Sequence, residues 1–299
     1  MPMLSQLSMI VSTKDVPACR AAIVQLLGFM KVERESINRA TEIFDDIYRL
    51  YQGLYPGYRR CDTPYHDFQH VLDVTLASLR LCDANILSGV EISTHGVFLA
   101  CIAAIFHDTG YIPELDDPVE TGAVYTSTHV SRSMLFAQKY MSEKNYPEDD
   151  IQRVSQMILL TDLAVKVQYV VFISRENEIL SKIVAAGDLL GQMADRIYLE
   201  KLPYLYLEFR AANITAYTSE EDLMQKTCGF FKVMDNRFKN DLDNIAECLY
   251  LHFDQRYDIN IDLYKIGMQH NLEYLSYIMT EHPGRHREFL KRDGIIKKL

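Results

Sequence analysis

The sequence predicts an all-α fold: a single compact domain built from many helices. Apolar residues recur at the three- and four-residue spacing that places them on one face of a helix. Glycine and proline are sparse, at 13 and 9 of 299 residues, which favours long helices joined by few turns. No internal repeat, low-complexity linker or change in composition divides the chain, so we expect one domain over residues 1–299.

The predicted helices follow one another with short interruptions. Asp15 and Pro17 are typical of a helix start, and Ser219, which precedes three acidic residues, is a typical N-cap. In chain order the expected helices are 14–31, 36 to about 53, one that holds His66 and His70 and ends near 85, 94–107, 128–143, 149–163, 176–194, one after Pro203, one after Ser219, and three more before the tail.

The remaining segments complete the predicted organisation. Residues 165–173 have a strand-like composition, and residues 291–298 are expected to form a loose, solvated end. We expect the N-terminal helices of 14–57 and the C-terminal helices of 236–290 to pack on a core formed by about 60–235.

Charge and composition exclude several classes of function. The formal net charge is −10, whereas nucleic-acid-binding proteins need clustered Lys and Arg, so we expect no nucleic-acid partner. The longest apolar runs fall short of the ~20 residues of a membrane helix, and the six cysteines form no CxxC pair. These features predict a cytoplasmic protein that has no membrane partner. They do not decide the oligomeric state, and a homodimer is possible. An acidic protein that binds a phosphate needs a local cation, such as a metal ion.

Two histidines and an aspartate occur at helical spacing in the stretch Tyr65–Val74. His70 follows His66 by four residues, and Asp73 follows His70 by three. Residues three and four apart share one face of a helix, so we expect these side chains to point the same way. A pair of histidines at this spacing is often accidental on an amphipathic helix, and this interpretation stays open for the stretch taken alone.

A second polar pair ends a long apolar run. Residues 97–106 are entirely apolar and lead directly into His107 and Asp108, with Gly110 two residues further on. A buried, ionised Asp is costly unless it is paired or coordinated, and a divalent metal removes that cost. Imidazole with carboxylate suits Zn, Fe or Mn, and carboxylate with water suits Mg. We therefore expect the two stretches to form halves of one site.

Together these motifs resemble a known family. The chain resembles the HD-domain superfamily of metal-dependent phosphohydrolases. Within that superfamily it is most similar to the catalytic domain of cyclic-nucleotide phosphodiesterases. The resemblance rests on Tyr65–Val74, His107-Asp108, Ile158–Leu163 and a later helical Asp188. The similarity runs from about residue 65 to residue 230. It implies a compact multi-helix domain of that type. It also implies that a metal-bound hydroxide hydrolyses a phosphoester, such as a nucleotide or a cyclic-nucleotide-like phosphodiester.

The resemblance also implies roles for single residues. The implied ligands of the first metal are His70, His107, Asp108 and Asp188. His66 would be the general acid and Asp73 a partner of a metal-binding histidine. His129 and Asp162 would lie near a second metal or the phosphate. Without the resemblance, Asp188 is more simply explained as a capping or surface residue, His129 as a helix-start residue and Asp162 as a turn residue.

Three residues depart from the family pattern. Tyr111 and Lys166 stand where the family has histidines around the second metal, so we expect one metal site, with Lys166 available to a phosphate. Thr227 replaces the glutamine that clamps the purine, which leaves the substrate open. The residues expected to line the substrate pocket are Tyr65, Tyr111, Thr227 and Phe230. The alternatives are a nucleotidase acting on phosphomonoesters and a catalytically impaired nucleotide-binding signalling module.

Overall fold

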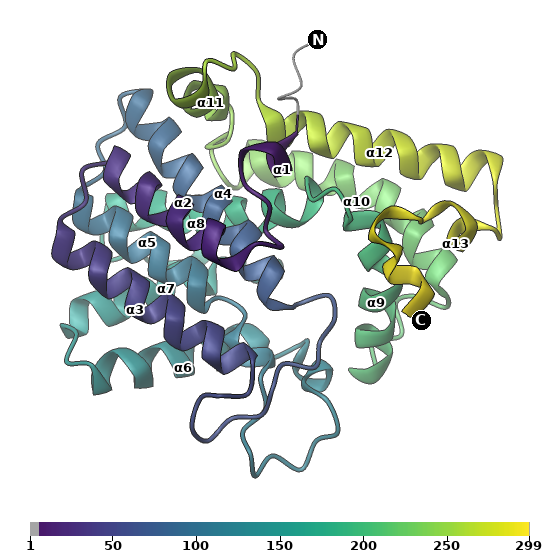
Figure 1. Cartoon of the computed structure of the whole chain (residues 1–299), viewed down its shortest axis with the longest axis horizontal. Helices are drawn as coiled ribbons and strands as arrows, with labels where there is room; N and C mark the ends of the chain where they lie inside the picture. The colour runs from purple at the N-terminus through teal and green to yellow at the C-terminus, as the bar shows by residue number, and fades with distance from the viewer. Residues whose placement is uncertain (1–5, 299) are drawn as a thin grey trace.

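The structure is a computed structural model that describes residues 6–298 (Figure 1). Its helices confirm the predicted all-α fold: α1 Leu7–Ile10, α2 Val16–Phe29, α3 Arg34–Tyr51, α4 Phe68–Leu87, α5 Thr94–Phe106, α6 His129–Glu143, α7 Glu148–Leu159, α8 Arg175–Met193, α9 Tyr198–Ala211, α10 Glu220–Asn240, α11 Leu249–Tyr257, α12 Leu263–Glu281 and α13 His286–Phe289. The 3₁₀ helices are η1 Thr109–Tyr111, η2 Gly122–Tyr125, η3 Val167–Tyr169 and η4 Arg292–Lys298. No strand occurs between residues 6 and 298, where Tyr58 and Glu114 form one isolated β-bridge.

The helices α4 and α8 form the most extensive helix contact of the molecule (Figure 1). Two glycines of α8 face α4 at this contact. A Cβ atom on Gly187 would lie 2.2 Å from the Ser78 hydroxyl, and one on Gly191 would lie 2.9 Å from the backbone nitrogen of Val74. Larger side chains would force the two helices apart. The glycines therefore let α8 lie directly against the helix that carries His70.

The helix α5 lies inside the core. Every residue from Gly96 to Phe106 is buried, and the helix contacts α3, α4, α7 and α8. A helix that is apolar on all sides needs such complete enclosure, which explains the continuous apolar run of the sequence. Because α5 ends at Phe106 with His107 as its C-cap, the first polar side chains after the apolar run are still buried in the core.

The C-terminal helices pack onto one end of the bundle, where α12 contacts α8, α9 and α10 (Figure 1). The helix α11 is fastened to α4 by a buried ionic contact. The Asp83 carboxylate lies 2.7 Å from His252 Nδ1 and accepts a hydrogen bond from Arg256 Nη2 at 2.7 Å. No helix in the described part of the chain combines the length and the apolar composition that crossing a membrane requires.

Three local predictions are wrong. Residues 165–173 form no strand but a 3₁₀ turn with extended flanks, and the side chain of Val171 is 87% exposed, because no neighbouring strand supplies backbone partners. Pro203 lies inside α9 rather than before its start. The tail is docked rather than loose, since Arg292 Nη1 donates to Asn271 Oδ1 at 3.1 Å and the Tyr204 hydroxyl donates to the carbonyl of Ile295 at 2.7 Å.

Candidate metal centre

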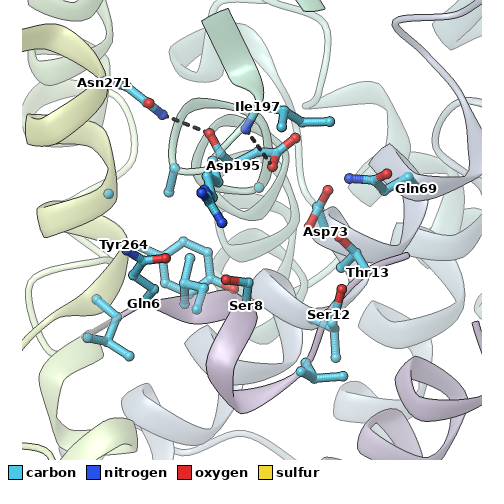
Figure 2. A pocket seen from close by; sticks show the side chains of 18 of the residues that line it. Gln6, Ser8, Ser12, Thr13, Gln69, Asp73, Asp195, Ile197, Tyr264 and Asn271 are labelled. Atoms are coloured by element: carbon cyan, nitrogen blue, oxygen red, sulfur yellow. Dashed lines mark hydrogen bonds between the residues drawn. The ribbon is translucent and has the colours of Figure 1, made fainter. Parts of the chain in front are cut away.

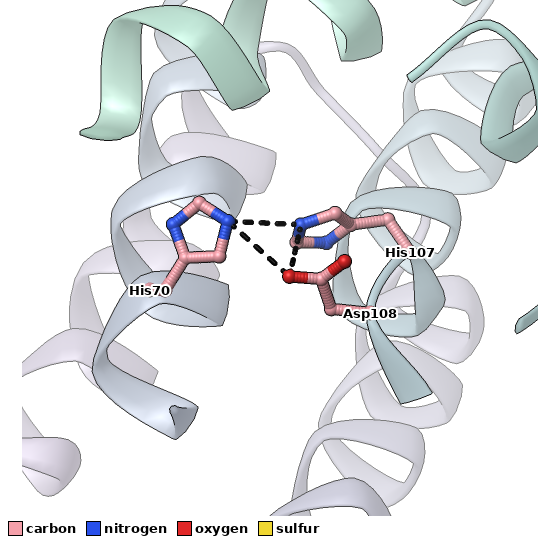
Figure 3. A group of neighbouring side chains, drawn as sticks. All are labelled: His70, His107 and Asp108. Carbon is pink, nitrogen blue, oxygen red and sulfur yellow. Dashed lines mark hydrogen bonds and ion pairs between the residues drawn. The ribbon is translucent and has the colours of Figure 1, made fainter. Parts of the chain in front are cut away.

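Side chains from α4 and from the end of α5 meet in the core. His70 lies in the first turn of α4, which begins after Asp67; the Asp67 carboxylate accepts the His70 backbone N–H at 3.0 Å and so caps the helix. The Nε2 atoms of His70 and His107 are 3.3 Å apart. Asp108 Oδ2 lies 3.3 Å from His70 Nε2 and 3.4 Å from His107 Nε2 (Figure 3). Three potential ligand atoms from two elements thus converge on one point.

The helix α8 adds a fourth group. Asp188 Oδ1 lies 3.2 Å from His70 Nε2 and 3.8 Å from His107 Nε2. The Asp188 side chain is 15% exposed, more than the Asp108 side chain at 4%, so Asp188 closes the cluster on the side toward solvent. The Gln192 amide lies one turn further along α8 and donates to Asp188 Oδ1 at 3.5 Å. All four sequence-predicted ligands are therefore brought together.

The donor set fits a divalent cation. The buried Asp108 Oδ2 has no hydrogen-bond partner among the described residues, although it lies close to two imidazoles. His107 Nδ1 lies 2.8 Å from the carbonyl of Ala104, which can only accept, so Nδ1 carries a proton and Nε2 keeps the lone pair in the neutral ring. A cation at this point would satisfy the orphaned oxygen and use the free lone pairs.

The electrostatics of the protein alone also favour positive charge here. Burial opposes charging of His107, but the adjacent Asp108 carboxylate outweighs this effect and raises the pKa of His107 to about 9. Burial likewise opposes ionisation of Asp108, yet the neighbouring His107 holds the pKa of Asp108 well below its usual range. These shifts favour a protonated His107 beside an ionised Asp108, and a bound cation would have to displace that proton.

His66 lies beside the cluster but outside α4, because the helix starts only at Phe68. The prediction that His66 and His70 share a helical face is therefore wrong, although the two rings are still neighbours, with centroids 5.8 Å apart. His66 Nδ1 is 2.6 Å from Glu208 Oε2 of α9. Burial disfavours the charged ring, but the Glu208 carboxylate prevails and raises the pKa of His66. Sequence reasoning missed Glu208, which no local motif marks.

Tyr111 fills the space between two histidines. Its ring stacks on His66 with centroids 4.2 Å apart and on His129 with centroids 4.5 Å apart. The Tyr111 hydroxyl lies 3.5 Å from His66 Nε2. His129 Nε2 lies 3.7 Å from Asp108 Oδ1, so His129 borders the cluster at its outer side. Burial lowers the pKa of His129, which favours its neutral form.

The other predicted site residues lie in different settings. Tyr65 is buried and its hydroxyl donates to Gln192 Oε1 at 2.8 Å, which links it to the cluster. Asp73 lies beside Thr13 and the turn after α8, and no histidine within residues 6–298 donates a hydrogen bond to Asp73 (Figure 2). Lys166 is exposed. Asp162 accepts from Ala164 N at 2.8 Å in a local turn.

Two predicted pocket residues belong to α10. The Thr227 hydroxyl is buried and donates to the carbonyl of Leu223 at 2.8 Å, one turn earlier in the helix. Phe230 is partly buried and packs against the hydrophobic core. These contacts describe how both side chains pack on α10, and their place in a substrate pocket stays a prediction.

Comparison with known proteins finds one partial match. The model of a family described as Npun_R2479-like matches residues 114–247, which is less than half of the chain. This region contains His129, Asp188 and Glu208 but not His70 or the His107-Asp108 pair. No curated protein and no solved structure matches the chain. Fold and site therefore define an all-α protein with a buried His/Asp cluster that could hold a metal ion.

Proposed function

We propose that the protein is a metal-dependent phosphohydrolase of the HD-domain type, with a nucleotide or cyclic-nucleotide-like phosphodiester as the favoured substrate class. One observation carries the proposal: His70, His107 and Asp108 present ligand atoms that all lie within 4.8 Å of one another, and one of these atoms is a buried, unpaired carboxylate oxygen. The sequence resemblance supports the reaction class.

The chain's own residues supply a binding set and a proton donor. A divalent cation held by His70, His107, Asp108 and Asp188 would neutralise phosphate charge and lower the pKa of water. Because Glu208 engages Nδ1 of His66, the Nε2 side of the ring is the side that can give a proton to a departing oxygen. The Glu208 carboxylate raises the pKa of His66, which favours the protonated form that a general acid needs.

One metal is proposed rather than two. Within residues 6–298, the His70–His107–Asp108 group is the one set of three or more ligand atoms close enough to share an ion. Tyr111 occupies the space between His66 and His129 with an aromatic ring that offers no imidazole nitrogen. The second metal of the two-metal pattern would therefore lack a ligand on this side.

The first test compares Asp108→Asn with Asp162→Asn. Asp162 is a matched control because its carboxylate accepts the Ala164 N–H in a local, exposed turn and is not one of the four proposed ligands. We expect the wild type and Asp162→Asn to retain bound divalent metal and to hydrolyse bis(p-nitrophenyl) phosphate with added Mn or Mg. Asp108→Asn should lose at least about 100-fold in metal affinity or turnover. The measurements are elemental analysis and release of nitrophenolate.

Substrate comparison then separates the alternatives. A nucleotidase would hydrolyse nucleoside monophosphates faster than cyclic or linear diesters. A signalling module would bind a nucleotide and release it intact after long incubation with metal. Absence of both bound metal and turnover across a broad panel of phosphoesters would refute the proposal.

A further inference from the structure

A large polar cavity lies apart from the metal centre. It has a volume of about 540 Å³ and lies between α1, α4, α12 and the turn that joins α8 to α9 (Figure 2). Ser8, Asp73, Asp195 and Tyr264 represent four of the segments that converge on it, and Arg292 of η4 represents a fifth. None of the four proposed metal ligands lines this cavity. Its volume lies within the range of about 300–1,000 Å³ that is typical of small-molecule sites.

A buried arginine without a counter-ion lines the cavity. Arg80 of α4 is 3% exposed, and its guanidinium forms no ion pair within residues 6–298 but lies over the rings of Phe253 and Tyr264. Its Nη1 donates to the Tyr264 hydroxyl at 2.8 Å, and its buried Nε has no hydrogen-bond partner. A buried cation is costly unless an anion pairs with it. In a protein of net charge −10, this unpaired cation points to an anionic ligand.

Two carboxyl groups line another part of the same cavity. Asp73 lies seven residues before Arg80, so the two side chains share a face of α4 about 10 Å apart along its axis. Asp195 is held in place because its Oδ1 accepts the Ile197 N–H at 3.1 Å and its carbonyl accepts from Asn271 Nδ2 at 2.8 Å (Figure 2). Burial raises the pKa of both Asp73 and Asp195. The oxygen atoms of both carboxyl groups can accept hydrogen bonds from hydroxyl groups.

We propose that this cavity is a second binding site, for a small organic anion that carries hydroxyl groups. The acid group of the ligand pairs with Arg80, and its hydroxyl groups face Asp73 and Asp195. Both a phosphate and a carboxylate provide the required anion, because a guanidinium pairs with either. A much smaller internal space of about 10 Å³, lined by both His70 and Asp73, lies beside the metal centre.

The test is calorimetric titration of the full chain in excess EDTA with two matched probes. Glycerol 3-phosphate and glycerate carry hydroxyl groups next to a phosphate and a carboxylate, respectively. We expect at least one of them to bind with a Kd of about 1 mM or tighter. The probe that binds identifies the acid group, and propyl phosphate or propionate, which lack hydroxyl groups, should bind about tenfold more weakly.

Variants assign the binding to the cavity. Arg80→Gln should weaken binding at least about tenfold, and Arg80→Lys, which keeps the buried charge, should retain more of it. Arg39→Gln is the matched control, because Arg39 is an exposed arginine of α3 that pairs with Glu35. His107→Ala should leave probe binding unchanged, so the result is independent of the proposed enzyme activity.

Two results would overturn the inference. One is the absence of binding of both hydroxylated probes at about 10 mM. The other is equal binding to Arg80→Gln, Arg80→Lys and Arg39→Gln, which would place the probe elsewhere. Circular dichroism of Arg80→Lys shows whether the fold tolerates changes at this position, so weakened binding to a folded variant remains interpretable.

Discussion

Glu208 determines the orientation of His66. Its Oε2 lies 2.6 Å from His66 Nδ1, and its Oε1 accepts the backbone N–H of Tyr65 at 2.7 Å. Since both carboxylate oxygens are engaged and the side chain is buried, the imidazole is held in one position beside the cluster. Glu208 is thus a positioning residue that also tunes the charge of the proposed proton donor.

Replacing Glu208 by Gln should lower the pKa of His66. The carboxylate is what raises this pKa against the effect of burial, and an amide carries no charge. As the pH rises, His66 should therefore lose its proton at a lower pH in Glu208→Gln than in the wild type. Titration of the histidine side chains by NMR measures this shift without any need for turnover.

Glu200→Gln provides the control, because Glu200 is also buried on α9 but contacts Arg292 rather than His66. It should leave the pKa of His66 unchanged. An unaltered His66 titration in Glu208→Gln would show that the carboxylate does not control this ring.

At the scale of the element, the close approach of α4 and α8 determines where Asp188 lies. Helix axes normally lie about 8–10 Å apart, depending on the side chains at the contact. Because Gly187 has no Cβ atom, the Ser78 hydroxyl can lie in the space that a side chain at position 187 would occupy. The next residue along α8 is Asp188, whose carboxylate reaches His70 across the same contact at 3.2 Å. Helix packing and ligand placement are therefore coupled.

Gly187→Ala should destabilise the protein by about 1–3 kcal/mol, because the new methyl group would overlap Ser78 in a packed core. Gly229→Ala on α10 is the control, since a Cβ there meets nothing within 4 Å. A glycine in a helix costs about 0.5–1 kcal/mol relative to alanine, so Gly229→Ala should be neutral or slightly stabilising. Urea unfolding measures both, and equal stability of the two variants would contradict the proposed role of the contact.

At the scale of the whole molecule, the metal centre joins helices that are distant in the chain. The four groups come from α4, from the end of α5 and from α8, and they meet only in the folded state. A cation bound by all of them would therefore stabilise the native state relative to the unfolded chain.

We therefore expect Mn²⁺ to raise the thermal unfolding temperature of the wild type and EDTA to reverse the effect. At a free ion concentration of about 100 times the Kd, the stabilisation should be about 2.7 kcal/mol. His107→Ala removes one proposed ligand and should show little response. A similar rise in both proteins would indicate that the ion binds elsewhere. Thermal unfolding followed by circular dichroism measures the difference.

Much of the fold was predictable because helical periodicity is a local property. The apolar run of α5 and the N-cap at Ser219 are confirmed by the structure. Local patterns also marked His70 and the His107-Asp108 pair. They failed at His66, because the Asp67 cap starts α4 at Phe68, two residues too late to include His66. They failed at 165–173 as well, since a strand requires a neighbouring strand that this fold does not provide in the described residues.

The sequence by itself determined the helical architecture through its periodicity. Residue type and spacing marked His70, His107 and Asp108 as candidate metal ligands, and the family resemblance added Asp188. Only the tertiary structure decided which groups surround them. The contact between His66 and Glu208 joins residues 142 positions apart, and the stacking of Tyr111 on two histidines depends on how three segments pack. The cavity at Arg80 likewise exists only where five segments meet. Such contacts arise from the packing of whole helices, which no local pattern of residues specifies.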